Sequence, residues 1–310
     1  MRAIVYRSFG GPEVLELAEV ERPVPERHEV LVRVRAAGVN PPDYKLRRTP
    51  YPPRYTEPPL TPGWDVSGVV EEAGRYTARF KPGDEVFGML NFPHPAAAYA
   101  EYVVARPRQL ARKPAGVGHV QAAALPMAAL TAWQAFEDVA EIRPGQRVLV
   151  HAAAGGVGHL VVQLAKLRGA YVIGTTRASK HDFVLGLGAD EVIDYTAVDF
   201  AEAVSGVDVV VDLVGGDYPR RSLPVLRPDG TFVGAAGMTD GDAEAYDRAG
   251  VRWDSFSVEP DHAALESIAR LVADGKLTAH VDQVFPLADA AKAHELMESG
   301  AFTGKLVLDV

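Results

Sequence analysis

Hydrophobic and polar residues alternate in short stretches along the first hundred residues of the chain. A period of two in residues 29–35 predicts a strand with one buried face, and similar runs occupy residues 66–71 and 100–104. Glycine- and proline-rich turn signals separate these runs. Short strands at this spacing predict a small barrel or sandwich in the N-terminal part of the chain.

A proline-rich segment interrupts this β region. Eight of the 23 prolines lie between Pro41 and Pro62. Proline fixes its own φ, lacks an amide donor and disfavours a helical conformation in the preceding residue. We therefore expect an extended, stiff loop here, and long loops without secondary structure are often functional.

Beyond residue 121 the pattern changes to alternating strands and helices. An alanine-rich stretch, residues 122–139, predicts a helix, and near-continuous runs of Val and Ile are typical of parallel strands that are buried on both faces. Six such strands are the number in a full doubly wound sheet, so we predict an α/β fold with a Rossmann sheet. The predicted strands are residues 147–150, 171–176, 191–194, 207–213, 231–235 and 252–258.

The last fifty residues predict two helices, residues 261–274 and 287–299, and a final strand, residues 305–309. Periodicity leaves open whether that strand extends the Rossmann sheet or returns to the N-terminal barrel. No internal repeat or low-complexity segment is visible.

The turn after the first Rossmann strand is the most informative part of the chain. A dinucleotide fingerprint has glycine at three fixed positions, and here Ala153 takes the first, followed by Gly155 and Gly158. Such a turn lets the backbone approach a pyrophosphate, whose charge the helix N-terminus favours. For His151 and His159, beside the turn, we expect a solvent-exposed or a packing role. The residues predicted to hold the cofactor here are Ala153, Gly155, Gly156, Val157 and Gly158.

The end of the next predicted strand indicates which dinucleotide binds. An NAD site normally presents Asp or Glu to the ribose about 20 residues past the glycines. This chain has hydroxyls and cations there, which can receive a 2′-phosphate. An open alternative is that Ser179 N-caps the next helix with Asp182, and both roles can coexist. We predict NADPH rather than NADH, held by Thr175, Thr176, Arg177, Ser179 and Lys180.

Composition excludes several classes of function. The chain has 310 residues, of which 47% are hydrophobic and 24% are charged, as in an ordinary globular enzyme. Its net charge of −9 argues against nucleic acid or an anionic membrane as a partner. The N-terminus begins as a strand and no apolar run reaches membrane length, so we expect a cytoplasmic protein. The absence of cysteine excludes disulfides and cysteine-liganded zinc, and the histidine spacing predicts no metal site.

Four motifs occur in an order that is specific to one superfamily. They are Lys81-Pro-Gly-Asp-Glu-Val86, Ala122-Ala-Ala-Leu-Pro126, Ala152-x-x-Gly155-x-x-Gly158 and Gly304-Lys-Leu-Val-Leu308. With them the chain resembles the medium-chain dehydrogenases/reductases, and among these the zinc-free quinone oxidoreductases. The resemblance implies a homodimer, with a GroES-like β-barrel substrate domain in residues 1–121 and 259–310. It implies a Rossmann NADP(H)-binding domain in residues 122–258, with the last strand in the GroES-like domain.

Departures from the zinc alcohol dehydrogenases narrow the expected chemistry. Where those relatives have a ligand cysteine this chain has Asn40, and where they have Gly-His-Glu it has Gly63-Trp64-Asp65. Hydride transfer to a free carbonyl commonly needs a Lewis acid. Hydride transfer to a quinone or a conjugated enone needs less help from an acid, because the negative charge delocalises into the π-system of the acceptor. The resemblance therefore implies an NADPH-dependent, zinc-independent reductase of a small-molecule quinone or activated alkene.

The resemblance also assigns residues to the site. Asn40, Asp43, Tyr51 and Trp64 match positions that line the family's substrate site, and Tyr51 matches a tyrosine that related enoyl reductases use as an acid. An open alternative is a packing role for Tyr51, with the proton taken from solvent. An open alternative for Asn40 and Asp43 is a capped turn. The further cofactor contacts that the resemblance and the strand-end glycines imply are Thr131, Tyr195, Val214, Gly215, Ala235, Gly237, Phe256, Val258, Gly304 and Lys305.

Two other functions stay open. An enoyl-thioester or 2-alkenal reductase on the same fold would need a basic groove for a carrier phosphate, to which Arg47, Arg48 and Arg54 could contribute. The chain could also be an NADPH-binding protein without catalysis.

Overall fold

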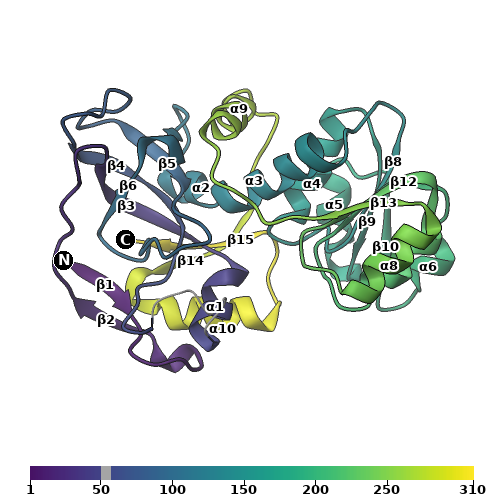
Figure 1. The fold of residues 1–310 in the computed structure, drawn as a ribbon, viewed down its shortest axis with the longest axis horizontal. Helices are drawn as coiled ribbons and strands as arrows, with labels where there is room; N and C mark the ends of the chain where they lie inside the picture. The colour runs from purple at the N-terminus through teal and green to yellow at the C-terminus, as the bar shows by residue number, and fades with distance from the viewer. Residues whose placement is uncertain (50–56) are drawn as a thin grey trace. The chain divides into compact units, whose positions relative to one another are not determined.

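The computed structural model describes residues 1–49 and 57–310, which form two compact units. The first unit contains residues 1–130 and 259–310, and the second contains residues 131–258. Figure 1 shows the elements of each unit by label. The boundary expected from the sequence, at residue 121, falls inside helix α2 (His119–Ala123), which packs on strands of the first unit.

A seven-stranded sheet organises the described part of the first unit, with the order β14-β15-β3-β4-β5-β7 and with β6 also paired to β3. The last strand of the chain, β15, runs antiparallel to β3, with Leu308 opposite Ala37. It therefore belongs with the N-terminal strands, as the family resemblance implied. The strands are β3 (Val30–Val39), β4 (Asp65–Ala73), β5 (Glu85–Met89), β6 (Tyr102–Ala105), β7 (Leu110–Arg112), β14 (Val281–Pro286) and β15 (Lys305–Asp309), beside a two-stranded sheet of β1 (Arg2–Val5) and β2 (Glu16–Glu19).

Strand β3 is the centre of this unit. The sequence predicted one buried face, but most of β3 is buried, because β4, β6 and β15 pair with it and α2 packs against it. Val30, Val32 and Val34 face a core cluster that includes Val66 and Val70. Burial of such side chains stabilises the unit by about 1.5–3 kcal/mol each.

The prediction of an extended loop from Pro41 is wrong for its first half, which is helix α1 (Pro41–Arg48). Pro41 and Pro42 occupy the first two helical positions, where the amide that proline lacks would have had no partner in the helix. The Asp43 carboxylate accepts a hydrogen bond from the Asn40 amide at 2.6 Å, one of the two bonds of a capping box. The capped turn, which was the alternative for Asn40 and Asp43, is therefore present as the start of helix α1.

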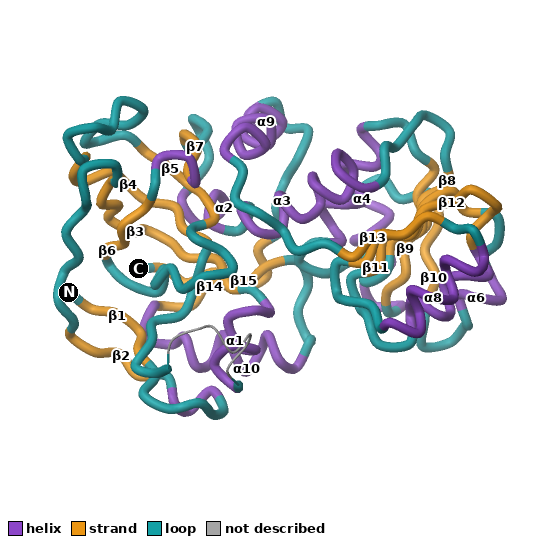
Figure 2. The backbone as a smooth tube through the Cα atoms, viewed as in Figure 1, coloured by secondary structure: helices purple, strands orange, loops and turns teal. Residues whose placement is uncertain are grey.

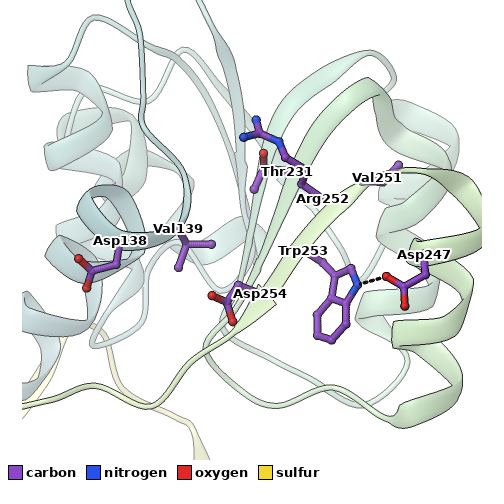
Figure 3. A pocket seen from close by; sticks show the side chains of 8 residues that line it. All are labelled: Asp138, Val139, Thr231, Asp247, Val251, Arg252, Trp253 and Asp254. Atoms are coloured by element: carbon purple, nitrogen blue, oxygen red, sulfur yellow. Dashed lines mark hydrogen bonds between the residues drawn. The ribbon is translucent and has the colours of Figure 1, made fainter.

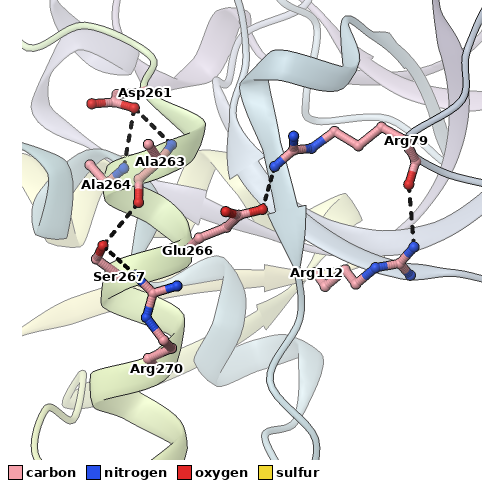
Figure 4. Close-up of polar contacts among 8 residues, drawn as sticks. All are labelled: Arg79, Arg112, Asp261, Ala263, Ala264, Glu266, Ser267 and Arg270. Atoms are coloured by element: carbon pink, nitrogen blue, oxygen red, sulfur yellow. Dashed lines mark hydrogen bonds and ion pairs between the residues drawn. The ribbon is translucent and has the colours of Figure 1, made fainter.

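Two further helices of the first unit come from the C-terminal segment, α9 (His262–Ala273) and α10 (Ala290–Ser299). The Asp261 side chain caps α9 by accepting from the amides of Ala263 and Ala264 at 2.8 and 3.2 Å. Glu266 on α9 pairs with Arg79, so the helix is also tied to the N-terminal segment (Figure 4).

A six-stranded parallel sheet forms the second unit, with the order β10-β9-β8-β11-β12-β13 (Figure 2). Numbered from β8, this is the doubly wound order 3-2-1-4-5-6, so the predicted Rossmann sheet is confirmed. The strands are β8 (Arg147–Val150), β9 (Tyr171–Thr176), β10 (Glu191–Asp194), β11 (Val207–Asp212), β12 (Leu226–Gly234) and β13 (Arg252–Ser255). The helices are α4 (Gly158–Leu167), α5 (His181–Gly186), α6 (Phe200–Ala203), α7 (Tyr218–Ser222) and α8 (Asp240–Ala249).

The single helix predicted over residues 122–139 is divided in the structure. Helix α2 ends at Ala123, α3 (Pro126–Gln134) follows, and a π-helical turn covers Ala135–Val139. Pro126 explains the division, because it cannot donate to a preceding turn and disfavours a helical conformation at Leu125.

Candidate active site

The turns that follow the six Rossmann strands meet at one edge of the sheet. All the strands are parallel, and their ends are in register: Thr176 lies opposite Asp194, and Gly234 lies opposite Ser255. Doubly wound sheets bind ligands at this edge. The predicted cofactor residues follow the strands here: residues 153–158 after β8, 177–180 after β9, Tyr195 after β10, Val214 and Gly215 after β11, Ala235 and Gly237 after β12, and Phe256 and Val258 after β13.

The glycine turn after β8 is tightly packed on itself. A Cβ atom added to Gly158 would lie 2.2 Å from the carbonyl oxygen of Ala152, so no other residue fits without moving the backbone. Ala153 is fully buried, and a Cβ on Gly174 would come within 2.9 Å of its methyl group. The His159 ring bonds the Gly155 carbonyl at 2.8 Å, a packing role as expected. A small residue at each of these positions gives the close turn that a pyrophosphate needs.

Arg177 and Tyr195 meet where β9 and β10 end. The guanidinium Nε of Arg177 donates to the Tyr195 hydroxyl at 3.1 Å. Arg177 and Ser179 are exposed, and Tyr195 is 38% exposed, so all three can be reached from solvent. The structure therefore brings two of the residues predicted to hold the cofactor into contact at an exposed place.

Thr175 lies apart from this group. Its side chain is fully buried, and its hydroxyl bonds Nδ1 of His151 at 3.2 Å. The other ring nitrogen of His151 bonds Ser222 at 3.0 Å, and burial lowers the pKa of this histidine to about 3. The neutral ring therefore serves as an internal link between β8, β9 and α7, and the Thr175 hydroxyl is used inside the sheet. Thr176 is also buried.

The alternative role of Ser179 as an N-cap is wrong. Ser179 lies within a 3₁₀ turn, Ala178–Lys180, and α5 begins only at His181. No side chain caps α5, so the pattern of Ser179 and Asp182 does not form a capping box.

Asp212 was missed by the sequence reasoning. It is fully buried at the end of β11, and its carboxylate accepts from the amides of Val214 at 2.9 Å and Gly215 at 3.2 Å. Burial raises the pKa of Asp212, and these two amide bonds oppose the rise. Asp212 thereby shapes the Val-Gly-Gly turn. The sequence signal that could have indicated this residue is an acidic residue directly after a run of valines.

The remaining cofactor predictions of the second unit vary in exposure. Thr131 on α3 and Val258 are buried, Phe256 and Ala235 are half-buried, and Gly237 is exposed. Strand β13 ends at Ser255 rather than at residue 258, so Phe256 and Val258 leave the sheet.

In the first unit, Asn40 is the centre of a buried polar cluster. Its Nδ2 donates to Oδ2 of Asp65 at 2.9 Å, and its Oδ1 accepts a short bond from Nζ of Lys305. Its backbone amide donates to Asp43, which also accepts from the Tyr99 hydroxyl at 3.0 Å. Every one of these side chains is at least 98% buried.

Burial dominates the electrostatics of this cluster. It raises the pKa of Asp43 to about 7 and that of Asp65 to about 6, although hydrogen bonds and the Lys305 ammonium oppose the rise. It lowers the pKa of Lys305 and of His294, the latter to about 3. The His294 ring lies 3.4 Å from the Tyr99 hydroxyl.

Lys305 was expected to close over the cofactor, and in the structure its ammonium faces inward. It donates to the Val39 carbonyl at 2.9 Å as well as to Asn40. The preceding Gly304 is needed for chain packing, because a Cβ there would lie 2.4 Å from the His280 carbonyl oxygen. Asn40 and Asp43 are surrounded by Lys305, Asp65, Tyr99 and His294. The sequence analysis did not predict that these four residues would meet there.

Trp64 is also buried, and its Nε1 donates to the His94 carbonyl at 2.8 Å. It packs edge-to-face on Phe92 at 5.3 Å between ring centroids. The indole therefore shapes the interior of the first unit. Tyr51, the fourth residue predicted in this part of the site, lies outside the described residues.

The basic groove suggested for a thioester carrier does not include Arg47. This guanidinium is fully buried and pairs with Glu298 on α10, and Arg48 binds the same carboxylate. The helical conformation of α1 turns Arg47 into the unit, so the prediction of a solvated arginine on a loop is wrong here. Arg54 lies outside the described residues.

A pocket of about 380 Å³ in the second unit contains none of the predicted cofactor residues. Figure 3 shows Trp253 at this pocket, with its Nε1 bonded to Asp247 at 2.8 Å. It is lined by Asp138, Val139, Thr231, Asp247, Val251, Arg252, Trp253 and Asp254.

The described part of the chain has neither a grouping of metal ligands nor a helix suited to crossing a membrane. Within residues 1–49 and 57–310, no three side chains of His, Cys, Asp or Glu are grouped closely enough to hold a metal ion. No helix in these ranges has both the length and the apolar character that crossing a membrane requires.

Comparison with known proteins identifies the family. Residues 26–115 match the alcohol dehydrogenase GroES-like domain, and residues 187–308 match a model described as zinc-binding dehydrogenase. The chain is 36% identical to a chloroplastic quinone-oxidoreductase homolog of Spinacia oleracea, over 100% of this chain and 98% of that protein. The chain belongs to the quinone oxidoreductase family of the medium-chain dehydrogenases/reductases.

Solved structures of family members agree with this fold along their whole length. The quinone oxidoreductase of Coxiella burnetii superimposes with a TM-score of 0.94 at 38% identity, covering 100% of this chain and 99% of that chain. The Escherichia coli quinone oxidoreductase complexed with NADPH gives 0.90 at 31% identity and covers both chains fully. The chain is therefore an oxidoreductase of a family that uses a nicotinamide cofactor, on a GroES-like and Rossmann fold.

Proposed function

We propose that the protein is an NADPH-dependent, zinc-independent reductase of quinones or activated alkenes. The observation that carries the choice of cofactor is the Arg177–Tyr195 pair at the ends of β9 and β10. Strand β9 ends in Thr175 and Thr176, so it offers no carboxylate to repel a 2′-phosphate. A cation held against a hydroxyl favours a phosphate group there.

The edge of the Rossmann sheet supplies the rest of the cofactor site. The tight turn formed by residues 153–158 receives the pyrophosphate at the start of α4, because helix N-termini favour negative charge. The turn ordered by Asp212 closes the neighbouring side, with Val214 and Gly215 against the dinucleotide. Ala235, Gly237, Phe256, Val258 and Thr131 complete the proposed contacts.

Residues of the first unit take the acceptor side of the reaction in this proposal. When bound, the nicotinamide supplies a hydride, and the acceptor gains that hydride and one proton. Asn40 orients the acceptor or the nicotinamide through its carboxamide, and Tyr51 donates the proton. The chain lacks cysteine and has Asn40 and Trp64 where zinc relatives have ligands, which favours acceptors that delocalise charge.

Initial-rate measurements with three classes of acceptor and one alcohol test this function. NADPH and NADH are each assayed with a simple quinone, a conjugated enone and crotonyl-CoA, and the oxidised cofactors are assayed with a primary alcohol. We expect NADPH turnover with the quinone or the enone, unchanged by a metal chelator. Faster thioester or alcohol turnover would overturn the proposal, as would tight NADPH binding with no acceptor reduced.

A homodimer is part of the proposal. The expectation comes from family members, many of which join their Rossmann sheets edge to edge. Light scattering on the purified protein would give about twice the chain mass of 33.3 kDa. A mass of one chain at assay concentration would contradict it.

A further inference from the structure

Two buried charges hold the Asn40 carboxamide from opposite ends. The Lys305 ammonium donates to its oxygen, and the Asp65 carboxylate accepts from its nitrogen at 2.9 Å. An ammonium has no acceptor and an ionised carboxylate has no donor. The carboxamide therefore has one allowed orientation, with its oxygen toward Lys305 and its nitrogen toward Asp65.

Each of the two charged groups is itself anchored to the backbone. Lys305 also donates to the Val39 carbonyl at 2.9 Å, at the end of β3. The second oxygen of Asp65 accepts from the Met127 amide at 3.0 Å, in the first turn of α3. The starts of β4, β15 and α3 thus converge on a single carboxamide at the end of β3.

The burial of these charges argues against a role in stability alone. Lys305 is 2% exposed and Asp65 is fully buried. Removing such a pair from water costs several kcal/mol per ion, and an apolar pair of similar volume is often as stable. Because burying Lys305 and Asp65 is unfavourable by itself and both bond the Asn40 carboxamide, the pair is suited to orienting that amide.

We propose that Lys305 and Asp65 are positioning residues that orient Asn40 for hydride transfer. The inference rests on the proposed function, in which Asn40 faces the nicotinamide and the acceptor. One N–H of Asn40 is taken by Asp65, and the second has no partner among the described residues. The ammonium at the oxygen end draws charge from the amide, which makes this second N–H a stronger donor to an oxygen that gains negative charge.

A double-mutant cycle between Lys305 and Asn40 tests this inference. We expect Asn40→Ala to lower kcat/KM for the acceptor by about 100- to 1,000-fold, the range for removing a donor to a developing charge. Lys305→Met alone should lower kcat by about 10-fold and leave KM for NADPH within about twofold, because the donor is misaligned rather than lost. In the Asn40→Ala background, Lys305→Met should cause no further loss.

The outcomes distinguish a failure of the positioning role from a failure of the proposed function of Asn40. Independent, multiplicative losses in the double variant would overturn the positioning role and leave the role of Asn40 intact. Full activity of Asn40→Ala would instead overturn the proposed function at Asn40. Lys292→Met removes a lysine of α10 that is 66% exposed and should leave all rates unchanged.

Asp65→Asn keeps the test valid if Lys305→Met does not fold. Asn40 and Met127 donate to different oxygens of Asp65. An asparagine at this position would replace one of these oxygens with an NH2 group, so a donor would face either Asn40 or Met127. We expect a loss of kcat that is again absent in the Asn40→Ala background. Equal losses in both backgrounds would show that Asp65 acts only by capping α3, and would reject the proposal.

Discussion

The two units hold their candidate site residues in different ways. In the Rossmann unit, the contacts come from backbone turns that follow successive parallel strands, and each turn is a short piece of sequence. In the first unit, Asn40 is held by Asp65 and Lys305, which lie 25 and 265 residues away along the chain. The Rossmann turns depend on close backbone packing beside an exposed Arg177–Tyr195 pair, whereas the Asn40 cluster depends on buried charge.

This difference predicts opposite sensitivities. The Rossmann edge should respond mainly to added volume, since its turns are held largely by amides and small residues, although the Asp212 carboxylate also holds the turn after β11. The Asn40 cluster should respond to protonation, since two carboxylates with raised pKa values share one ammonium. The following changes test the contrast, in order of decreasing expected effect.

Gly158→Val should abolish NADPH binding. The new Cβ would lie 2.2 Å from the Ala152 carbonyl oxygen, so the turn and the start of α4 must move apart. We expect a destabilisation of about 1–3 kcal/mol and no measurable saturation in a fluorescence titration with NADPH. Gly186→Ala is the matched control, because nothing lies within 4 Å of its Cβ and alanine favours the helix. Normal NADPH affinity in Gly158→Val would show that the pyrophosphate binds elsewhere.

Asp43→Asn should remove part of the pH dependence of stability. The folded pKa of Asp43 is about 7 and its ordinary value is 3.8, so the folded state holds this proton more tightly. The contribution of Asp43 to the free energy of unfolding is full below about pH 4 and is lost as pH rises through about 7. Between pH 5 and pH 7.5, the wild type should therefore lose about 2–3 kcal/mol more than the variant.

Urea unfolding at these two pH values measures the difference. Asp84→Asn serves as a control of opposite sign, since a hydrogen bond from Arg112 lowers the pKa of Asp84 and its contribution is lost only as pH falls. Parallel pH profiles for the wild type and Asp43→Asn would show that Asp43 does not hold this proton.

Arg177→Ala should weaken NADPH binding by about 1–3 kcal/mol for one lost charged contact and change NADH binding little. The guanidinium is exposed beside Tyr195, where a 2′-phosphate would bind. Thr175→Val is the control, because its hydroxyl is occupied by His151 and should not affect the choice between cofactors. Isothermal titration calorimetry with NADPH and with NADH gives the ratio of their dissociation constants. An equal loss for NADH would place the phosphate elsewhere.

Tyr195→Phe should have the smallest effect. It removes the hydroxyl that accepts from Arg177 and leaves the ring, so NADPH affinity should fall by about 0.5–1.5 kcal/mol. Stopped-flow release of NADPH would detect this as faster dissociation. A loss as large as that of Arg177→Ala would mean that the hydroxyl, and not the cation, dominates the contact.

Local sequence signals predicted the strands and turns of the Rossmann sheet well, because the residues that form each of them are adjacent in the chain. The strand, turn and helix around Ala153, Gly155 and Gly158 are specified by neighbours, and a parallel sheet then brings the turns together. Thr175 shows the limit of this reasoning, since strand alternation decides which hydroxyl faces outward and His151 takes it inside. Asp212 lies at a strand end that the pattern predicted, but its capping role depends on the turn that follows.

The Asn40 cluster was only partly foreseen. Family resemblance pointed to Asn40 and Asp43, and the prolines at 41 and 42 suggested a loop where a helix begins. The inward direction of Lys305 and the burial of Arg47 could not be read from polarity, because charged residues are usually solvated. Only their pairing with Asn40 and Glu298 allows them inside.

The amino-acid sequence by itself determined the strands of the Rossmann sheet, the glycine turn and the hydroxyl and cationic residues after β9. These depend on backbone preferences and on neighbours within a few residues. The tertiary structure decided which polar groups are buried and which partner each one has. Burial and charge pairing are set by segments hundreds of residues apart, such as Lys305 beside Asn40, and no local pattern records that distance.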